Sequence, residues 1–362
     1  MGGRLWAHIR DSLNYFFMAV LAVVTALAVS SFVLLWQGIN PFQAYAGLFE
    51  GAFVGLSNFG ASLVLALPLM LAGLGMALAF RAGIFNIGGE GQIYLGAMAS
   101  TYIATRIHGL PSGLHIILAL IFGCLAGGLW ALIPGYLKVR RGFNEVITTV
   151  LLNYIGVYFV NYSVHSFLKD PGTYAPQSMP IPAAVRLPLL LQGTEVNIGL
   201  FIGLLAGVVL FIVLFKTDWG FQIRVVGQNA EAGRTAGMNS ERVMLTAMVF
   251  SGCLAGLAGA VQVLGAQHIL LEDFSPNTGY DAIAVALLGN LNPIGTVISA
   301  VFIGALRQGA NVMQILSGIP VTIVNILQAV IILCVLAFGK FKLLNRIIKP
   351  VKKSAQSEVN TL

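Results

Sequence analysis

Long apolar runs constrain the fold of this chain more than any other feature of its sequence. Such runs recur from Leu13 to Phe338, and about 20 apolar residues are what a helix needs to cross a bilayer. Hydrophobic residues make up 57% of the 362 residues and charged residues only 9%, against about 25% charged in soluble domains. A β-barrel would show short alternating strands instead. The sequence therefore predicts an all-α, polytopic transmembrane helical bundle.

About ten segments of the chain are candidates for the membrane, with bounds good to a few residues. They are 12–36, 60–80, 87–106, 113–137, 144–168, 196–216, 242–268, 278–291, 295–315 and 319–339. The eighth, 278–291, is too short to cross unaided, so we expect a re-entrant segment or half of a broken helix. The chain 1–362 is predicted to form one transmembrane domain, with its membrane part at 12–339.

Basic residues are distributed unevenly between the two sides of this predicted bundle. If the amino terminus is inside, sixteen of the 20 Lys and Arg residues fall on inner segments, and Arg106, Lys169 and Arg186 on outer ones. Arg307 lies within a segment. Because cytoplasmic loops carry the excess of Lys and Arg, both termini are predicted to be cytoplasmic. The amino-terminal segment is 1–11 and the basic tail is 340–362.

Several function classes lack support in the sequence. The three cysteines lie in apolar runs without C-x-x-C spacing, and the five histidines have no metal-ligand spacing, so no metal site is expected. Basic residues do not gather with aromatic residues, so no nucleic-acid partner is expected. A P-loop, a nucleophile elbow and a catalytic carboxylate pair are all missing from the sequence. We therefore expect a protein that is not an enzyme and binds no cofactor itself.

Two short polar patterns open predicted membrane segments. One, N-x-G-x-E, ends at Glu90, and the other, N-x-G-x-D, ends at Asp281. In each, Asn and Gly break the helix pattern and an acid stands in the first turn, where it offsets the positive end of the helix dipole. The two patterns lie five segments apart and run in opposite directions, which suggests an inverted repeat of five plus five segments. Chance resemblance over five positions is the alternative.

Polar side chains at membrane depth are the candidate functional residues, because each charge there costs at least about 2.5 kcal/mol on insertion scales. The candidates for a translocation path are Asn86, Glu90, Glu145, Asn153, Asp281, Arg307 and Asn311. Arg307 and Asn311 share a helix face at a spacing of four. Tyr154, Tyr158 and Tyr162 repeat at the same spacing on a face beside that of Asn153. Hydrogen bonding between helices is the alternative to a path.

Three further features concern packing and loops. Small residues at a spacing of four, Gly123/Gly127, Gly252/Gly256 and Gly199/Gly203/Gly207, predict close helix packing. The longest outer loop, about 169–195, is rich in proline and is expected to be extended. The longest inner loop, 217–241, contains a short helix candidate at 229–236, with Gly237 as its stop.

Four ordered motifs resemble permease subunits of ABC importers in the ribose and branched-chain amino-acid permease superfamily. They are FRAGIFNIGGEGQIYLGA, RGFNEVITTVLLNYI, GFQIRVVGQNAEAGRTAGMNSER and GYDAIAVALLGNLNPIGTVISAVFIGALRQGA. Within that superfamily they look most like the branch that serves nucleosides through lipoproteins of the basic membrane protein type. The similarity runs from about the second segment to the last, and it favours nucleosides over free sugars, with branched-chain amino acids third.

The resemblance implies a permease subunit of an ATP-driven importer in a bacterial inner or plasma membrane, which forms the path for nucleosides or related purine compounds. The implied partners are a second permease, identical or related, a cytoplasmic ATPase subunit that binds ATP, and an external substrate-binding lipoprotein. The inner loop 217–241 is then the ATPase-docking loop. The residues that carry this role over are Gly227, Asn229, Glu231, Ala232, Ala236 and Gly237.

Alternative functions remain open at this point. The chain could be a permease for simple sugars or branched-chain amino acids, an ion-coupled secondary carrier that uses Glu90 or Asp281, or a membrane scaffold that transports nothing. If Glu90 has a structural role, Glu90→Gln should lower stability modestly and leave ATP-driven transport nearly normal, because Gln keeps the shape and most hydrogen bonding. A proton-coupling Glu90 predicts complete loss of uptake by the same variant.

Overall fold

The computed structural model describes residues 24–25, 27–32, 34–36, 38–318, 325–326, 328–330 and 332–334. The first and last predicted membrane segments, 12–36 and 319–339, fall partly or largely outside these residues, and so do the predicted terminal segments 1–11 and 340–362. The chain divides into two compact units. One unit is made of Met1–Gly51 with Gly309–Leu362, and the other is Ala52–Gln308.

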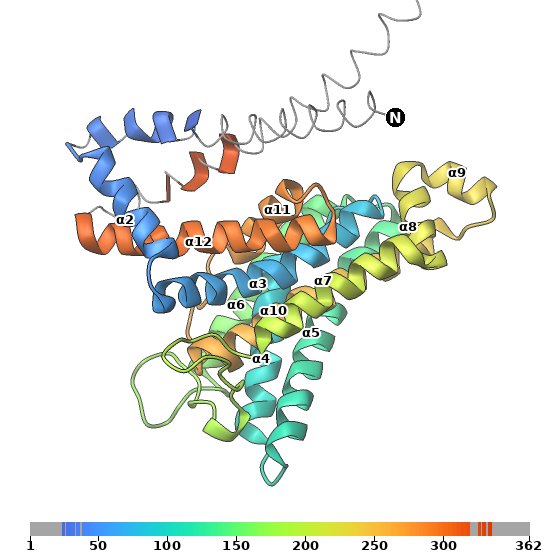
Figure 1. Cartoon of the computed structure of the whole chain (residues 1–362). Helices are drawn as coiled ribbons and strands as arrows, with labels where there is room; N and C mark the ends of the chain where they lie inside the picture. Colours follow the sequence, from blue (N-terminus) through green and yellow to red (C-terminus); the bar gives the residue numbers. More distant parts are fainter. Residues whose placement is uncertain are drawn as a thin grey trace, which may run out of the picture. The chain divides into compact units, whose positions relative to one another are not determined.

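The described residues are mainly helical, as Figure 1 shows. The helices are α2 (Pro41–Phe53), α3 (Leu56–Arg81), α4 (Gly89–Arg106), α5 (Ser112–Arg141), α6 (Glu145–His165), α7 (Gly199–Lys216), α8 (Asp218–Gln228), α9 (Ala230–Thr235), α10 (Ser240–Gln262), α11 (Thr278–Leu288) and α12 (Pro293–Ser317). A π-helical turn, Val263–Gln267, extends α10, and Ala183–Val185 forms a 3-10 turn. Between residues 38 and 318 the only β-structure consists of isolated bridges such as Lys169 with Ser178.

Six helices among the described residues are long and apolar enough to cross a membrane. They are α3, α5, α6, α7, α10 with its π turn, and α12. The chain is therefore an integral membrane protein with several spans, and its all-α class is confirmed. Helix α4 covers the predicted segment 87–106, and α11 has only 11 residues, so the expected short eighth segment is present.

Helix α2 was not predicted from the sequence. It begins at Pro41, whose fixed φ and missing N–H suit the first turn of a helix. Its 13 residues are fewer than a span needs, and they include Glu50, so it gave no long apolar signal. In the smaller unit, Met1–Gly51 with Gly309–Leu362, Ala44 of α2 packs against Ala310 and Met313 of α12.

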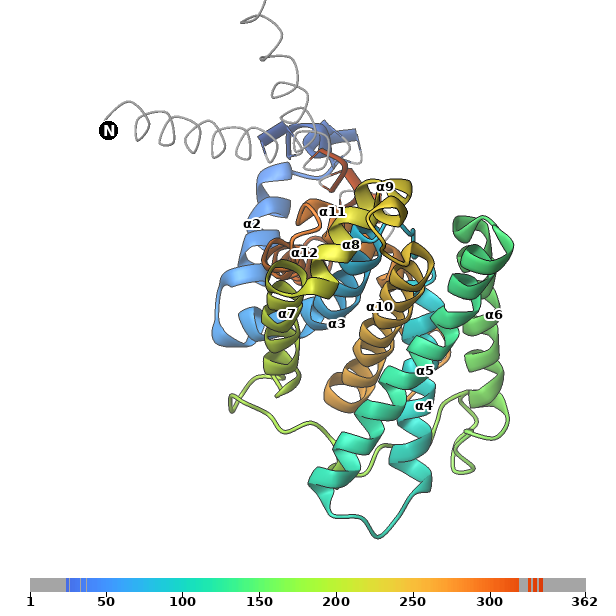
Figure 2. The same ribbon diagram turned by 90° about the vertical axis from the view of Figure 1, so that its right-hand side faces the viewer.

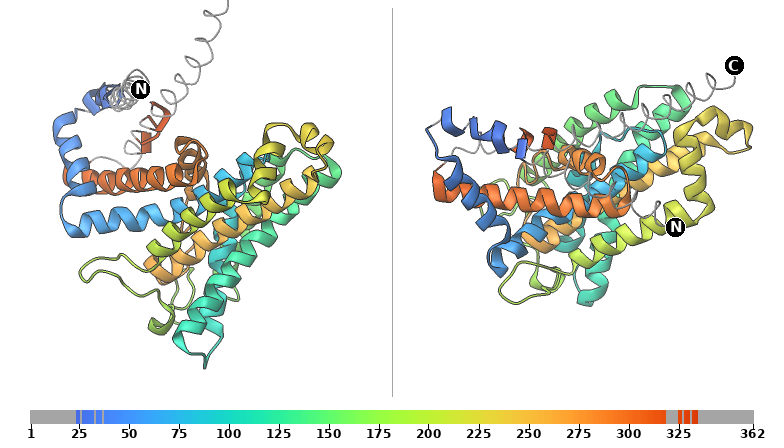
Figure 3. Two further views of the ribbon diagram at one scale, coloured as in Figure 1. Left: turned by 45° about the vertical axis from the view of Figure 1, so that its right-hand side comes forward. Right: turned by 45° about the horizontal axis from the view of Figure 1, so that its top comes forward.

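Helix α10 is the centre of the larger unit. It packs against α3, α4 and α5, and Figures 2 and 3 show it running between α3 and α5. A Cβ placed on Gly256 would lie 2.9 Å from the Cα of Gly127, and one on Gly252 would lie 2.5 Å from the carbonyl oxygen of Gly127. Only glycine allows this approach, so the predicted close packing of small residues is confirmed.

Two loops lie at opposite ends of this unit in Figures 1 and 2, the long loop 166–198 at one end and α9 at the other. The long loop is irregular apart from its 3-10 turn, as its prolines predict. It is tied to the segment that follows α10. The backbone N–H of Ser178 donates to the carbonyl of Leu270 at 2.9 Å, and that of Ile181 donates to His268 at 2.8 Å.

Candidate translocation site and docking loop

Asn86 lies in the turn between α3 and α4, where the chain reverses. Its side chain is fully buried and hydrogen-bonded at both ends. The amide nitrogen donates to Gln92 Oε1 at 2.9 Å and to Ser251 Oγ at 2.8 Å. The amide oxygen accepts from the backbone N–H of Gly88 and from Gln92 Nε2, both at 3.0 Å. Buried polar groups need such partners, so Asn86 holds the turn.

The start of α4 lies inside the helix bundle, part-way along α6 and α10. Two residues contact the turn before α4: Asn153 of α6 and Ser251 of α10. Asn153 is the eighth residue after Glu145, where α6 begins, and Ser251 is the eleventh after Ser240, where α10 begins. At about 1.5 Å per residue these positions are about 12 Å and 16 Å along their helices. Helix α4 therefore begins inside the bundle, which agrees with the predicted re-start of a helix after these glycines.

Glu90 joins the beginnings of two helices. It stands in the first turn of α4 and is only 5% exposed. One carboxylate oxygen accepts from the backbone N–H of Asn277 at 2.8 Å, and the other accepts from that of Gly279 at 2.6 Å. These N–H groups lie at the start of α11 and have no partner inside that helix. The Glu90 carboxylate thus also caps the N-terminus of α11 and offsets the positive end of that helix dipole, a role that the sequence pattern did not reveal.

The two predicted polar patterns meet in space. A Cβ on Gly279 would lie 2.6 Å from the Cα of Glu90, so any side chain at this position would collide with the backbone of α4. A third helix, α6, also contacts the start of α4. The Oδ1 of its Asn153 accepts from the N–H of Gly91 at 2.9 Å, and the Nδ2 donates to the carbonyl of Ile87 at 2.8 Å. Three predicted candidates, Asn86, Glu90 and Asn153, therefore form one buried cluster.

The remaining candidates lie outside this cluster. Asp281, in the first turn of α11, forms an ion pair with Arg307 of α12, and both side chains are partly exposed. Asn311 is exposed and belongs to the smaller unit. Sequence reasoning missed Gln92 and Ser251, because neither polar residue stands out on its own helix.

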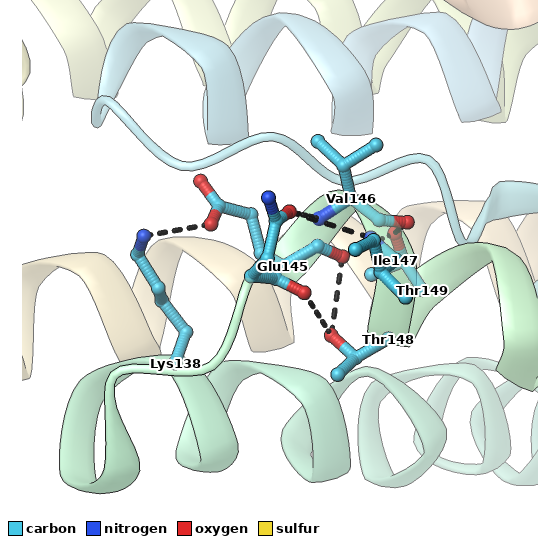
Figure 4. Close-up of polar contacts among 7 residues, drawn as sticks. Lys138, Glu145, Val146, Ile147, Thr148 and Thr149 are labelled. Atoms are coloured by element: carbon cyan, nitrogen blue, oxygen red, sulfur yellow. Dashed lines mark hydrogen bonds and ion pairs between the residues drawn. The ribbon is translucent and has the colours of Figure 1, made fainter.

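Glu145 lies at the start of α6, about 12 Å along that helix from Asn153. Its carboxylate is 2.7 Å from Nζ of Lys138 on α5, as Figure 4 shows. The preceding Asn144 caps α6 by accepting the N–H of Val146 at 2.9 Å. The Lys138–Glu145 ion pair therefore joins the facing ends of α5 and α6.

In the described part of the chain, no group of three or more His, Cys, Asp or Glu residues could hold a metal.

The predicted docking loop contains two helices, α8 and α9. Asn229 ends α8 and caps α9, because its Oδ1 accepts from the N–H groups of Glu231 and Ala232, both at 3.0 Å. Gly237 has a φ of +80°, which confirms it as the stop of the predicted helix. Helix α8 was not predicted from the sequence. Thr217 caps it by accepting the N–H of Gly220 at 3.2 Å, and because threonine is a common N-cap residue, it was a sequence signal for the start of this helix.

The loop is fixed to the bundle and exposes charge. A Cβ on Gly227 would collide with the carbonyl of Arg81, so α8 packs directly on the end of α3. Arg234 lies 3.6 Å from Glu231 and 3.7 Å from Glu241. Beside Arg234 is an open depression of about 380 Å³, lined by Arg234, Gly237, Met238, Asn239, Ser240 and Glu241. The surface of the loop beside α9 is therefore charged and partly hollowed.

Several helices long and apolar enough to cross a membrane define an integral membrane protein, in which α4 begins inside the bundle and the helical loop 217–241 lies at one end. Residues 58–336 match the family described as branched-chain amino acid transport system, permease component. The chain belongs to this family, and the predicted resemblance is confirmed. The family consists of transport subunits rather than enzymes.

Three curated relatives match along most of their length. The chain is 37% identical over 327 residues to a guanosine ABC transporter permease of Bacillus subtilis, covering 89% of this chain and 93% of that one. It is 35% identical over 322 residues to a nucleoside ABC transporter permease of Lactococcus lactis subsp. cremoris, covering 86% and 88%. It is 33% identical over 338 residues to a glucose ABC transporter permease of Haloferax volcanii, covering 89% and 87%. No solved structure matches the chain.

Proposed function

We propose that this chain is the permease subunit of an ATP-driven ABC importer and that nucleosides or related purine compounds are its cargo. The observation that carries the proposal is the 37% identity to a guanosine permease over 89% of the chain. The 35% identity to a nucleoside permease adds to it. A glucose permease at 33% identity keeps simple sugars as the second candidate.

The proposed partners are an ATPase subunit that binds ATP, a second permease, identical or related, and an external substrate-binding lipoprotein. The ATPase docks on the loop 217–241. In support, α8 and α9 project at the end of the unit opposite the long loop 166–198 (Figure 1). Their capped ends and packing on α3 give a partner a surface that does not need to be ordered on binding.

The proposed topology has ten membrane segments in a single domain, with both termini in the cytoplasm of a bacterial cell. An inverted repeat of five plus five segments relates α4 to α11. In support, α4 begins just after its N-x-G pattern and α11 begins within its own, and the first turns of the two helices touch. Broken helices in matching positions are typical of inverted repeats in transporters.

The ion-coupled alternative is less well supported by the contacts of the two acids. Glu90 gives both oxygens to backbone N–H groups, and Asp281 is paired with Arg307. A proton-coupling carboxylate must change its charge in each cycle, which would break these contacts. Glu90, Asn86 and Asn153 are therefore proposed to hold the broken helices in register.

Uptake in cells tests the cargo. The chain is expressed with its partner subunits in a strain that lacks nucleoside uptake, and entry of radiolabelled guanosine, glucose and leucine is compared. We expect guanosine to enter and the other two to stay near background. Entry of glucose or leucine without guanosine would contradict the proposed cargo while leaving the permease class intact.

A further inference from the structure

Helix α6 exposes three tyrosines in a row. Tyr154, Tyr158 and Tyr162 are 57%, 68% and 62% exposed. Tyr154 and Tyr158 lie about 14 Å and 20 Å along the helix from Glu145, so both are near the middle of a span. Tyrosine is enriched at the two membrane interfaces and not at the centre, and a phenol hydroxyl in hydrocarbon has no hydrogen-bond partner. The exposed Ile147, Leu151 and Ile155 stand seven residues before these tyrosines and share their face, so it is the mid-span hydroxyls, rather than the whole surface, that are poorly suited to lipid.

The tyrosines share a face of α6 with residues that bind exposed carboxylates. Asn161 Nδ2 donates to the carboxylate of Asp273 at 2.9 Å, and His165 Nε2 lies 3.2 Å from that of Glu272. Asn161 stands seven residues after Tyr154, and His165 seven residues after Tyr158. Residues seven apart lie on the same helix face, so the tyrosines lie on the side of α6 that meets residues 268–277.

Helix α5 meets α6 on a different side. There, Trp130 Nε1 donates to the carbonyl of Leu152 at 3.3 Å. Phe159 stands seven residues after Leu152 and is 44% exposed. Because consecutive helix residues point about 100° apart, the side chain of Phe159 faces a different direction from that of Tyr158, which it directly follows. The two neighbouring aromatic residues belong to different faces.

The segment 268–277 continues the polar surface beside the tyrosines. Glu272, Asp273 and Asn277 are all exposed, and Asp281 follows at the start of α11 with its side chain 33% exposed. Charged carboxylates at or near membrane depth face water or protein rather than lipid. Asn161 and His165 join this segment to the tyrosine-bearing side of α6, and the two together are here called the polar aromatic face, defined by Tyr154, Tyr158, Tyr162, Asp273 and Asn277.

We propose that the polar aromatic face is the cargo-contacting wall of the translocation path and that the planar base of a nucleoside stacks on its tyrosine rings. This inference rests on the proposed function of nucleoside import. Aromatic rings accept any base by stacking, because every base has a π-face. The Asp273 carboxylate is an acceptor for the ribose hydroxyls near one end of the row.

The spacing of the rings suits movement along the face. Successive tyrosines are about 6 Å apart along α6, so a base that leaves one ring can reach the next. Several weak sites in series allow entry without trapping the cargo. The buried cluster around Glu90 cannot take this role in the described conformation, since its polar atoms are occupied by backbone and side-chain partners.

Uptake by variants of the assembled importer is the first test. Tyr158→Leu removes the ring and should raise KM for guanosine about tenfold, the scale of losing one stacked base. Tyr158→Phe keeps the ring and should stay close to wild type. Phe159→Leu is the matched control and should leave KM unchanged. Equal KM values for Tyr158→Leu and wild type, at matched membrane levels, would overturn the proposal.

Thiol labelling is the second test, and it does not depend on turnover. On a background in which Cys124, Cys253 and Cys334 are replaced by serine, a membrane-impermeant thiol reagent should modify Tyr158→Cys, and guanosine should slow the reaction. Phe159→Cys should remain unmodified. Tyr154→Cys repeats the test should the first variant fail to insert.

Three results of the labelling would overturn the proposal. An unreactive Tyr158→Cys would mean that the face meets lipid. A spontaneous crosslink to a second permease without access to reagent would mean a closed protein interface. Modification that no nucleoside slows would mean that cargo does not touch the face. Failure of the proposed function is separable, because it appears in the unsubstituted importer as uptake of another cargo without guanosine.

Discussion

The Glu90 carboxylate lies between the first turns of α4 and α11, and both of its oxygens accept backbone N–H groups. The expectation that Gln would keep most of this hydrogen bonding therefore needs revision. A glutamine amide has one oxygen and one NH₂ group, and the NH₂ would face a backbone N–H. Two buried donors would then oppose each other.

We predict that Glu90→Gln lowers the free energy of unfolding by about 1–3 kcal/mol, the cost of leaving a buried donor unsatisfied. Thermal unfolding of the purified protein in detergent measures the change. Glu231→Gln is the control, because its side chain is 78% exposed and such surface changes usually stay within about 0.5 kcal/mol. A wild-type melting temperature for Glu90→Gln would contradict this account. Loss of all uptake by a well-folded Glu90→Gln would favour the ion-coupled carrier instead.

We also predict that Gly279→Ala is strongly destabilising. The added Cβ would lie 2.6 Å from the Cα of Glu90, and backbone atoms cannot yield as a flexible side chain can. Overpacking of this kind costs about 1–3 kcal/mol or more. Gly113→Ala at the start of α5 is the matched control, because a Cβ there meets nothing within 4 Å. Equal melting temperatures for the two variants would show that α4 and α11 do not touch at Gly279.

At the scale of elements, the sequence predicted what depends on local pattern. The apolar lengths of α3, α5, α7 and α10 were readable, and so was α9, as a short helix that stops at Gly237. The contact of Glu90 with the start of α11 was not, since it joins residues 187 or more positions apart. Single-sequence periodicity carries no information about such pairs.

The docking loop gives an element-scale prediction. Glu231→Arg reverses an exposed charge on α9 and removes its contact with Arg234. We expect the permease to insert normally but to lose co-purification with the ATPase and ATP-driven uptake. Glu195→Arg makes the same change on the exposed loop at the opposite end of the unit and should keep the ATPase bound. Equal ATPase recovery with both variants would remove the assignment of α9 as the docking helix.

In the whole molecule, the proposed topology places the long loop 166–198 and α9 on opposite sides of the membrane. Tyr174 lies in that loop and is fully exposed, and Ala236 follows α9 and is exposed. On a background without native cysteines, Tyr174→Cys should label from outside the cell. Ala236→Cys should label only after the membrane is permeabilised. Labelling of both variants from the same side would contradict the proposed orientation.

The most direct test of the central claim is the energy source of guanosine uptake. Right-side-out vesicles that carry the chain and its partner subunits are loaded with ATP, and uptake of radiolabelled guanosine is followed with and without an uncoupler. An ATP-driven importer predicts uptake that requires internal ATP and is unaffected by the uncoupler. Uptake without ATP that the uncoupler abolishes would contradict the account and identify an ion-coupled carrier.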